Sequence, residues 1–213
     1  MSEPNALRSR LETGADELGL ALDAAACDQL IALLTLLERW NKTYNLTAIA
    51  EPGEALVKHV FDSLVAAPSV QGSRVLDVGT GAGFPGLPLA VLAPERHVTL
   101  LDSNRKKLRF VSQAAAELGL TNVSTVHARA EAHEDAAGFD TVTCRALAPL
   151  ERFVGWAGHL AAPGGRLLAL KGPIGDNELA AVPAGWRTVC EPVVVPFLDG
   201  RRTLVVISRD GDA

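Results

Sequence analysis

Short apolar runs alternate with amphipathic segments between residues 74 and 171, and this alternation constrains the fold more than any other feature of the sequence. Each apolar run suits one strand, and each intervening segment suits one crossover helix. Strands joined by helices pair in parallel, so the pattern predicts a doubly wound α/β sheet. The expected strands are 74–78, 97–101, 123–127, 139–144 and 166–170, and the expected helices are 85–92, 104–118 and 150–160.

The end of the chain follows a different pattern. Two β-rich runs, 188–195 and 203–208, are separated by a connection too short to contain a helix. Two strands joined so closely pair antiparallel. A parallel sheet that ends in an antiparallel hairpin is typical of class I methyltransferases and is less usual in nicotinamide-binding folds.

The residues before the alternating region predict helices. Leucines recur at helical spacing over residues 30–37, and Asp23 is a suitable N-cap for that helix. Residues 54–67 predict a second amphipathic helix, ended by the proline that follows. We therefore expect residues 1–70 to form a helical extension and residues 71–213 to form the cofactor-binding domain.

A glycine-rich loop follows the first expected strand and opens the first crossover helix, over residues 77–86. Its glycines allow a tight turn and the close approach of a ligand, and the helix start offers N–H groups to an anion. Gly81, Gly83 and Gly86 also satisfy the dinucleotide pattern G-x-G-x-x-G. The loop therefore predicts a nucleotide-like cofactor without specifying which one.

Two carboxylates at strand ends favour S-adenosylmethionine as that cofactor. Asp77 precedes the glycines, where it would repel a pyrophosphate but suits a ligand that carries an ammonium group. Asp102 ends the next strand, where an acidic side chain accepts hydrogen bonds from ribose hydroxyls. Asp102 also has an alternative role as the cap of the helix that starts near Asn104.

A cluster of cations opens the second crossover helix, although the chain has a net charge of -5. Cations at a helix N-terminus oppose the helix dipole, so their presence there has two interpretations. They form either a solvated charged face or a phosphate-binding edge beside the active site. The cluster comprises Arg105, Lys106, Lys107 and Arg109, and Lys58, His59, Arg201 and Arg202 could extend it.

The segment after the fourth expected strand bears on which atom is methylated. Residues 143–149 lack the Asp/Asn-Pro-Pro-aromatic loop of amino-nitrogen methyltransferases. Methylation of pyrimidine carbon 5 needs a cysteine nucleophile, and Cys144 lies near that position within an unsuitable sequence. A ring nitrogen with a lone pair needs only orientation and proximity. Arg145, at the carboxyl end of the strand, could hold the base or its phosphate, or could be a surface arginine.

The chain resembles the bacterial 16S ribosomal RNA (guanine-N7) methyltransferase G family, also called glucose-inhibited division protein B. The resemblance covers most of the chain and implies a class I fold with a helical N-terminal extension. It is carried by segments 40–47, 59–64, 77–86, 101–102, 129–131, 144–146 and 170–172.

The resemblance also implies the reaction and five of the site residues: Gly79, Phe84, Ala130, Glu131 and Arg145. It implies methylation of a guanine in the decoding-centre loop of 16S ribosomal RNA, in free RNA or in the small ribosomal subunit. Arg145 is then expected to position the base or the cofactor, with no general base. The expected cofactor-binding residues are Asp77, Gly79, Gly81, Gly83, Phe84, Asp102, Ala130, Glu131 and Arg145. The expected RNA-binding residues are Arg105, Lys106, Lys107, Arg109, Lys171, Arg201 and Arg202.

Other functions remain open at this point. A small-molecule methyltransferase, a nicotinamide-dependent oxidoreductase and a non-catalytic RNA-binding protein would each share part of the pattern. We expect no membrane span, no secretory signal and no metal site, because no apolar run is long enough and the five histidines lack ligand spacing. Three widely spaced cysteines suggest reduced thiols in a cytoplasmic protein, and nothing in the sequence demands an oligomer.

Overall fold

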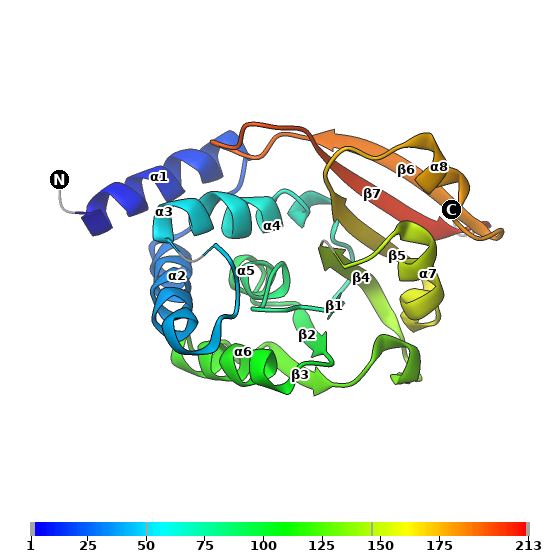
Figure 1. Cartoon of the computed structure of the whole chain (residues 1–213), viewed down its shortest axis with the longest axis horizontal. Helices are drawn as coiled ribbons and strands as arrows, with labels where there is room; N and C mark the ends of the chain where they lie inside the picture. Colours follow the sequence, from blue (N-terminus) through cyan, green and yellow to red (C-terminus); the bar gives the residue numbers. More distant parts are fainter. Residues whose placement is uncertain (1–2, 50, 146, 212–213) are drawn as a thin grey trace.

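A seven-stranded sheet forms the centre of the computed structural model, which describes residues 3–49, 51–145 and 147–211 (Figure 1). The strand order is β3-β2-β1-β4-β5-β7-β6. Strands β1 to β5 pair in parallel, whereas β7 pairs antiparallel with both β5 and β6. The predicted doubly wound sheet with a terminal antiparallel hairpin is confirmed. The strands are β1 (Arg74–Val78), β2 (His97–Asp102), β3 (Val123–His127), β4 (Phe139–Arg145), β5 (Ala161–Lys171), β6 (Trp186–Val193) and β7 (Arg202–Arg209).

Helices cover both faces of the sheet because neighbouring strand residues point to opposite faces. Leu100 of β2 packs into the apolar cluster that contains α2, α5 and α6, whereas Leu101 packs into the cluster that contains α7. Both faces are therefore buried, as a parallel sheet requires. The helices are α1 (Glu3–Glu17), α2 (Ala24–Tyr44), α3 (Pro52–Ala55), α4 (Asp62–Leu64), α5 (Gly86–Leu92), α6 (Arg105–Glu117), α7 (Leu150–Ala157) and α8 (Asp176–Ala180).

The N-terminal helices share the core of the sheet. Leu30 of α2 is fully buried in the same cluster as Val98 of β2. The predicted cap of α2 is present, because the Asp23 carboxylate accepts a hydrogen bond from the Ala26 N–H at 2.7 Å. The boundary predicted at residue 70 therefore divides two chain segments that pack around one core, and it stays a prediction.

The helix predicted over residues 54–67 differs from the structure. Helix α3 ends at Ala55, a π-helical stretch spans Leu56–Phe61, and α4 ends at Leu64. Pro68 lies in a separate 3-10 turn, so the helix ends before the proline. A π-helical turn carries an extra residue, and here it presents Leu56, Val60 and Phe61 to the core as fully buried side chains.

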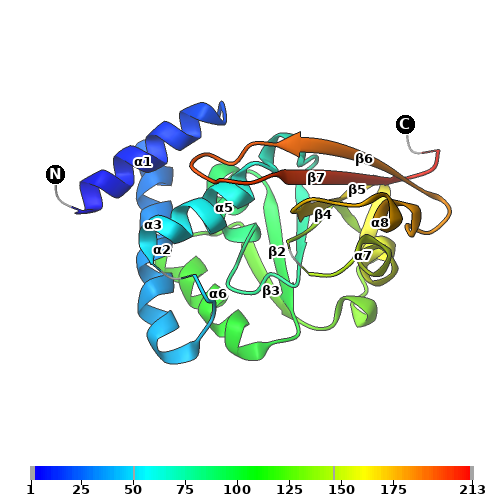
Figure 2. The same ribbon diagram turned by 45° about the horizontal axis from the view of Figure 1, so that its top comes forward.

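The connection between β6 and β7 reaches back to the N-terminal helices (Figure 2). Phe197 in this connection packs against Phe61, with ring centroids 5.9 Å apart. The guanidinium of Arg10 in α1 lies 4.8 Å from the centre of the same ring. The first and last parts of the chain therefore hold each other at one end of the sheet. No helix among the described residues is long and apolar enough to span a bilayer.

The strand order reverses between β1 and β4. From this point the chain runs outward through β2 and β3 on one side and through β5 on the other. Crossover connections leave on opposite faces there, so a crevice forms beyond the carboxyl ends of the two strands. The fold thereby places the glycine loop after β1 and the end of β4 beside the same crevice.

Candidate active site

A cleft of about 710 Å³ occupies this crevice. That volume is in the range of sites that enclose a small organic ligand. Its walls come from the glycine loop, the ends of β2 and β4, and the segment that follows α2. The lining residues are Leu46, Thr47, His59, Val78, Gly79, Thr80, Gly81, Ala82, Phe84, Leu101, Asp102, Ser103, Asn104, Lys107, Ala128, Arg129, Ala130, Glu131, Arg145, Leu147 and Trp156.

Gly81 keeps part of the cleft open. Its φ of +60° is rarely adopted by residues with a side chain. A Cβ built at this position would meet no atom closer than 3.9 Å, so it would project into free space. A side chain there would fill the cleft rather than clash with the protein. The loop therefore leaves room for a ligand to approach its backbone.

Asp77 is hydrogen-bonded to the glycine loop and to the first residue of α5. Its side chain is fully buried, and its Oδ2 accepts hydrogen bonds from Thr80 Oγ1 at 2.6 Å and from the Gly86 N–H at 2.9 Å. Burial raises the pKa of this carboxyl group to about 6, although both hydrogen bonds oppose the rise. Asp77 does not line the cleft, so its contact with an ammonium group of the cofactor stays a prediction.

The start of α5 differs from the prediction. The Gly86 N–H is used by Asp77, and the Leu87 N–H donates to the Gly83 carbonyl at 2.7 Å. These N–H groups are therefore not free for an anion. Pro85 is the N-cap of α5 rather than its first residue. Gly83 is not among the residues that line the cleft. A Cβ built on Gly83 would meet Leu87 Cδ1 at 2.3 Å.

Asp102 lines the cleft beside Gly81 and joins two loops. Its Oδ2 accepts from the Gly81 N–H at 2.8 Å, and its Oδ1 accepts from the Asn104 N–H at 2.7 Å. The cap of α6 is Asn104, whose side chain accepts from the Lys106 and Lys107 N–H groups. A carboxylate oxygen can accept two hydrogen bonds and each oxygen of Asp102 accepts one from the described residues, so Asp102 retains capacity for hydroxyl groups.

Ala130 and Glu131 line the far end of the cleft from a 3-10 turn after β3. Ala130 is buried and Glu131 is exposed. Leu147 and Trp156 add apolar surface to the lining. The cleft lining therefore includes apolar side chains and one exposed carboxylate.

Arg145 lies at the end of β4, between the cleft and the N-terminal helices. Its NH1 donates to the Lys58 carbonyl at 2.6 Å and to Asp62 Oδ2 at 3.2 Å. Its NH2 donates to Nδ1 of His59 at 3.1 Å. Its Nε and one N–H of NH2 have no hydrogen-bond partner within the described ranges. The guanidinium is therefore fixed on one side and keeps two donors for a ligand.

His59 is uncharged at neutral pH. Burial, together with the positive charge of Arg145, lowers the pKa of its imidazole to about 4. Because Nδ1 accepts from Arg145, Nε2 carries the proton, and it lies 3.0 Å from the Ile49 carbonyl and 3.1 Å from Thr47 Oγ1. The ring stacks on Phe84 with centroids 4.8 Å apart. His59 therefore holds Arg145 and Phe84 in fixed positions.

Cys144 is buried beside Arg145 and is unsuited to nucleophilic attack. Burial is the main reason that the pKa of its thiol lies well above its usual range. The attacking species in cysteine chemistry is the thiolate, which this environment disfavours.

Comparisons with known proteins agree with this geometry. The family model described as rRNA small subunit methyltransferase G matches residues 26–205. Curated proteins named ribosomal RNA small subunit methyltransferase G are similar along most of their length. The one from Shewanella amazonensis is 44% identical and covers 95% of this chain and 99% of its own, and the one from Pseudomonas paraeruginosa is 48% identical and covers 93% and 94%.

The chain belongs to this family. It is an S-adenosylmethionine-dependent methyltransferase, so the predicted activity and cofactor are confirmed. Solved structures agree in fold. The O-methyltransferase TomG from Streptomyces achromogenes in complex with SAM aligns with a TM-score of 0.58 at 18% identity, over 99% of this chain and 100% of its own. The glycopeptide N-methyltransferase MtfA with S-adenosyl-L-homocysteine aligns with a TM-score of 0.59 at 14% identity, over 70% and 89%.

Two predicted RNA-binding residues of this methyltransferase are engaged in ion pairs. Arg202 donates from Nε to Asp62 Oδ1 at 2.8 Å. Lys171 pairs with Glu178 and donates to the Ala148 carbonyl at 2.8 Å. Their contacts with RNA stay predictions, and Arg202 is also part of the cluster around Arg145.

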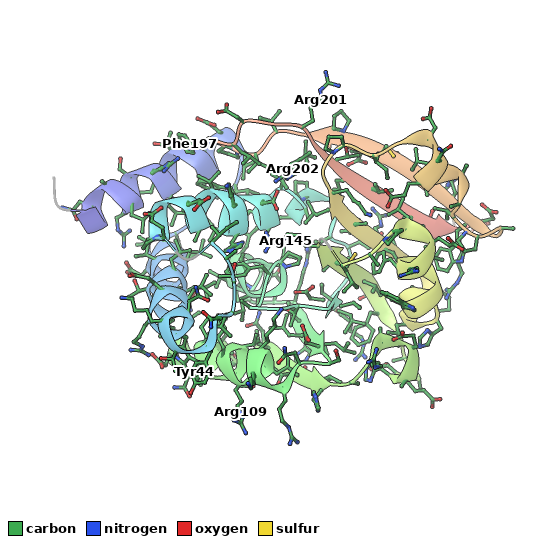
Figure 3. All side chains as sticks on the ribbon, viewed as in Figure 1. Tyr44, Arg109, Arg145, Phe197, Arg201 and Arg202 are labelled. Atoms are coloured by element: carbon green, nitrogen blue, oxygen red, sulfur yellow. The ribbon has the colours of Figure 1, made fainter. Side chains whose placement is uncertain are left out.

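The remaining predicted cations of the methyltransferase have separate positions. Lys107 lines the cleft, beside the open space at Gly81. Arg105 and Arg109 line a shallow groove on the outer side of α6. Arg201 directly precedes β7, and its side chain points away from the rest of the molecule (Figure 3). The cations therefore flank the cleft on two sides and do not form one patch.

The sequence prediction assigned no role in the site to three residues that the structure places there, although all three lie in segments 40–47 and 59–64, which carry the family resemblance. Thr47 and His59 line the cleft, and Asp62 holds two arginines that are distant in sequence. The sequence indicates His59 only as a possible extension of the basic patch and as a histidine without metal-ligand spacing. Its helical spacing of three from Asp62 is a signal, because residues at that spacing share one helix face.

Proposed function

We propose that this methyltransferase transfers a methyl group to N7 of a guanine in 16S ribosomal RNA of the small subunit. The observation that carries the proposal is the family match over residues 26–205, together with relatives whose names specify ribosomal RNA of the small subunit. The target guanine lies in the decoding-centre loop on this proposal. The substrate would place the enzyme in the cytoplasm, and we propose that it acts as a monomer.

The cleft fits S-adenosylmethionine, because Gly81 leaves the backbone accessible and Asp102 retains acceptor capacity. When bound, S-adenosylmethionine supplies a methyl group on a positively charged sulfur. Asp102 would accept from the ribose hydroxyls. Ala130 and Glu131 would border the adenine. Lys107 would face the carboxylate of the cofactor's methionine half, which would lie beside the glycine loop.

Arg145 would orient the guanine. Its two free N–H donors suit the O6 acceptor of the base, which lies beside N7. His59 and Asp62 hold the guanidinium on its other side, so little conformational entropy is lost when the base binds. Phe84, whose ring lies 5.6 Å from the guanidinium carbon, completes this wall of the cleft.

The reaction requires no general base. N7 of guanine carries a lone pair and no proton, so the bond from N7 to the methyl carbon forms as the bond from sulfur to that carbon breaks. The positive charge passes from sulfur to the guanine ring. His59 agrees with this chemistry because its low pKa makes it a weak base and both its nitrogens are hydrogen-bonded. The chain therefore contributes orientation and exclusion of water.

RNA phosphates would contact the cations that flank the cleft. Arg105, Lys106 and Arg109 are exposed and have no ion-pair partner within the described part of the chain. Arg201 is exposed directly before β7. Lys171 and Arg202 would contact RNA only if each can also do so while it stays paired with Glu178 or Asp62, respectively.

Two substitutions test the assignment of these roles. Asp102→Ala should weaken cofactor binding at least tenfold, because it removes the proposed ribose acceptor and one anchor of the glycine loop. Lys106→Ala should leave cofactor affinity unchanged, and it should weaken RNA binding and reduce its salt dependence by about one unit of slope. Calorimetric titration of S-adenosylmethionine and RNA binding at two salt concentrations measure both effects. The assignment would be contradicted if Asp102→Ala weakened only RNA binding, or if Lys106→Ala weakened cofactor binding.

A further inference from the structure

Tyr44 presents an aromatic ring on the surface beside the cleft. It lies at the end of α2 and is 48% exposed. Its ring contacts Trp40 with centroids 5.1 Å apart, and Trp40 meets the fully buried Phe110 at 5.7 Å. The three rings form a column that runs from the core to the surface. Tyr44 is therefore supported on its inner side and open on its outer side.

The groove beside this column is cationic. It has a volume of about 550 Å³, and Trp40, Arg105, Arg109 and His127 are among its lining residues. Arg105 and Arg109 lie one turn apart on α6, are exposed, and have no ion-pair partner in the described ranges. The first turn of α6 contains no acidic residue. Cations there oppose the helix dipole, so helix stability does not explain them.

A nearby arginine, unlike the two arginines of the groove, has an ion-pair partner. Arg39 on α2 is paired with Glu117 near the other end of α6, with Arg39 NH2 3.1 Å from Oε1. Glu117 therefore has a cationic partner outside the groove, and no acidic residue is among the described residues that line the groove. This local charge occurs in a chain whose net charge is -5.

The groove adjoins the cleft at two elements. On α6, Lys107 lines the cleft whereas Arg105 and Arg109 line the groove. After α2, Leu46 and Thr47 line the cleft, only a few residues beyond Tyr44. Figure 3 shows Tyr44 and Arg109 together at one edge of the molecule, with Arg145 toward its centre. A nucleic-acid strand bound in the groove would therefore continue into the cleft.

We propose that this groove binds the single-stranded nucleotides next to the target guanine, with one base stacked on Tyr44 and phosphates held by Arg105 and Arg109. Aromatic rings with neighbouring cations are the usual means of binding unpaired nucleotides, because every base has a face that can stack. Single-stranded RNA matches both features of the groove, and it is the substrate class of the proposed function. This inference rests on the proposed function and extends it to a second contact region.

The test uses the full-length enzyme and small ribosomal subunits from cells that lack its gene. Tyr44→Ala should lower kcat/KM for the subunits about tenfold through KM, and Tyr44→Phe should retain wild-type values because it keeps the ring. Arg105→Ala and Arg109→Ala should each reduce the salt dependence of subunit binding by about one unit of slope. Arg39→Ala is the matched control, and it should change neither quantity. The affinity for S-adenosylmethionine should stay unchanged in every variant, which also verifies folding.

The outcomes separate the two proposals. If the wild-type enzyme methylates the subunits and the Tyr44 and arginine variants equal it, the groove does not bind RNA and the proposed function stands. If Arg39→Ala has the same effect as Arg109→Ala, the contact is general surface charge and the groove proposal is wrong. If the wild-type enzyme binds S-adenosylmethionine but neither binds nor methylates the subunits, the proposed function fails and the groove proposal fails with it.

Discussion

Replacing Asp62 with asparagine should loosen the wall of the cleft that holds Arg145. The Asp62 side chain is 8% exposed, and its two oxygens accept from Arg145 at 3.2 Å and from Arg202 at 2.8 Å. Asparagine has one acceptor oxygen, so its NH2 group would face one of the two guanidinium groups. The variant loses one charge-assisted hydrogen bond and leaves a positive charge partly unpaired in a buried place.

The magnitude follows from these contacts. A hydrogen bond to a charged group contributes about 1.5–3 kcal/mol. Removing one partner of a buried ion pair costs about 3–5 kcal/mol, and the partial exposure of Arg202 favours the lower end. We expect the free energy of unfolding to fall by about 3 kcal/mol, which corresponds to a fall in melting temperature of roughly 6–12 °C for a chain of this size. Methyl transfer should fall about 10- to 100-fold through kcat, because Arg145 loses its fixed orientation.

The assay combines thermal unfolding, calorimetric titration of S-adenosylmethionine and steady-state methyl transfer. Asp16→Asn is the matched control, because Asp16 is exposed on α1 and should leave all three measurements unchanged. Asp62→Asn should bind S-adenosylmethionine with nearly wild-type affinity, since Asp62 does not line the cleft. A variant with wild-type kcat and melting temperature would refute the role assigned to the pairing of Arg145, Asp62 and Arg202.

Three further predictions concern the glycine loop, His59 and Cys144. Gly81→Ala should abolish measurable cofactor binding yet cost only about 1–3 kcal/mol of stability from its backbone strain, whereas Gly86→Ala should fail mainly in thermal unfolding, because its Cβ would lie 1.9 Å from Leu100 Cδ2. His59 is uncharged in both states above about pH 6.5, and below this the unfolded chain binds a proton that the folded chain binds only near pH 4, so stability should fall with pH. In urea unfolding at pH 7 and pH 5, His59→Gln should lose about 2 kcal/mol less than the wild type, and an equal loss would count against the low pKa. Cys144→Ala should retain methyl transfer, and complete inactivation of a folded, cofactor-binding variant would revive cysteine chemistry.

Asp77 partly opposes the pH effect of His59. Its pKa is raised to about 6 from an ordinary value of 3.8, so the folded chain retains a proton that the unfolded chain releases in this window. This group stabilises the fold at low pH, and that contribution is lost as the pH rises through about 6. The comparison of His59→Gln with the wild type removes the contribution of Asp77, because both proteins share it.

The local order of the fold was predictable because it depends on near neighbours in the chain. The apolar alternation predicts β1 and β3 with the bounds that the structure has, and Asp23 caps α2 as predicted. The predicted bounds are wrong where tertiary contacts determine where a strand begins. Strand β5 begins at Ala161 rather than at residue 166, because its first residue pairs with Phe139 of β4 across a bulge.

The site was predictable in part for the same reason. The glycine loop and Asp102 are recognisable because each directly follows or ends an apolar strand pattern, although the hydrogen bond from Gly81 to Asp102 joins two separate loops. The cluster around Arg145 joins residues from the N-terminal helices, β4 and β7, and no local pattern in the sequence brings Asp62 to Arg202. The pairing of Lys171 with Glu178 also depends on the short helix α8, which the sequence pattern did not predict.

One measurement tests the central claim most directly. Small ribosomal subunits from cells that lack this gene would be incubated with the enzyme and labelled S-adenosylmethionine, and the RNA would be digested and analysed by mass spectrometry. We predict labelled N7-methylguanosine from 16S ribosomal RNA, and none from subunits that were already methylated. Cofactor binding without label in the RNA, or label on any other nucleoside, would contradict the proposed function.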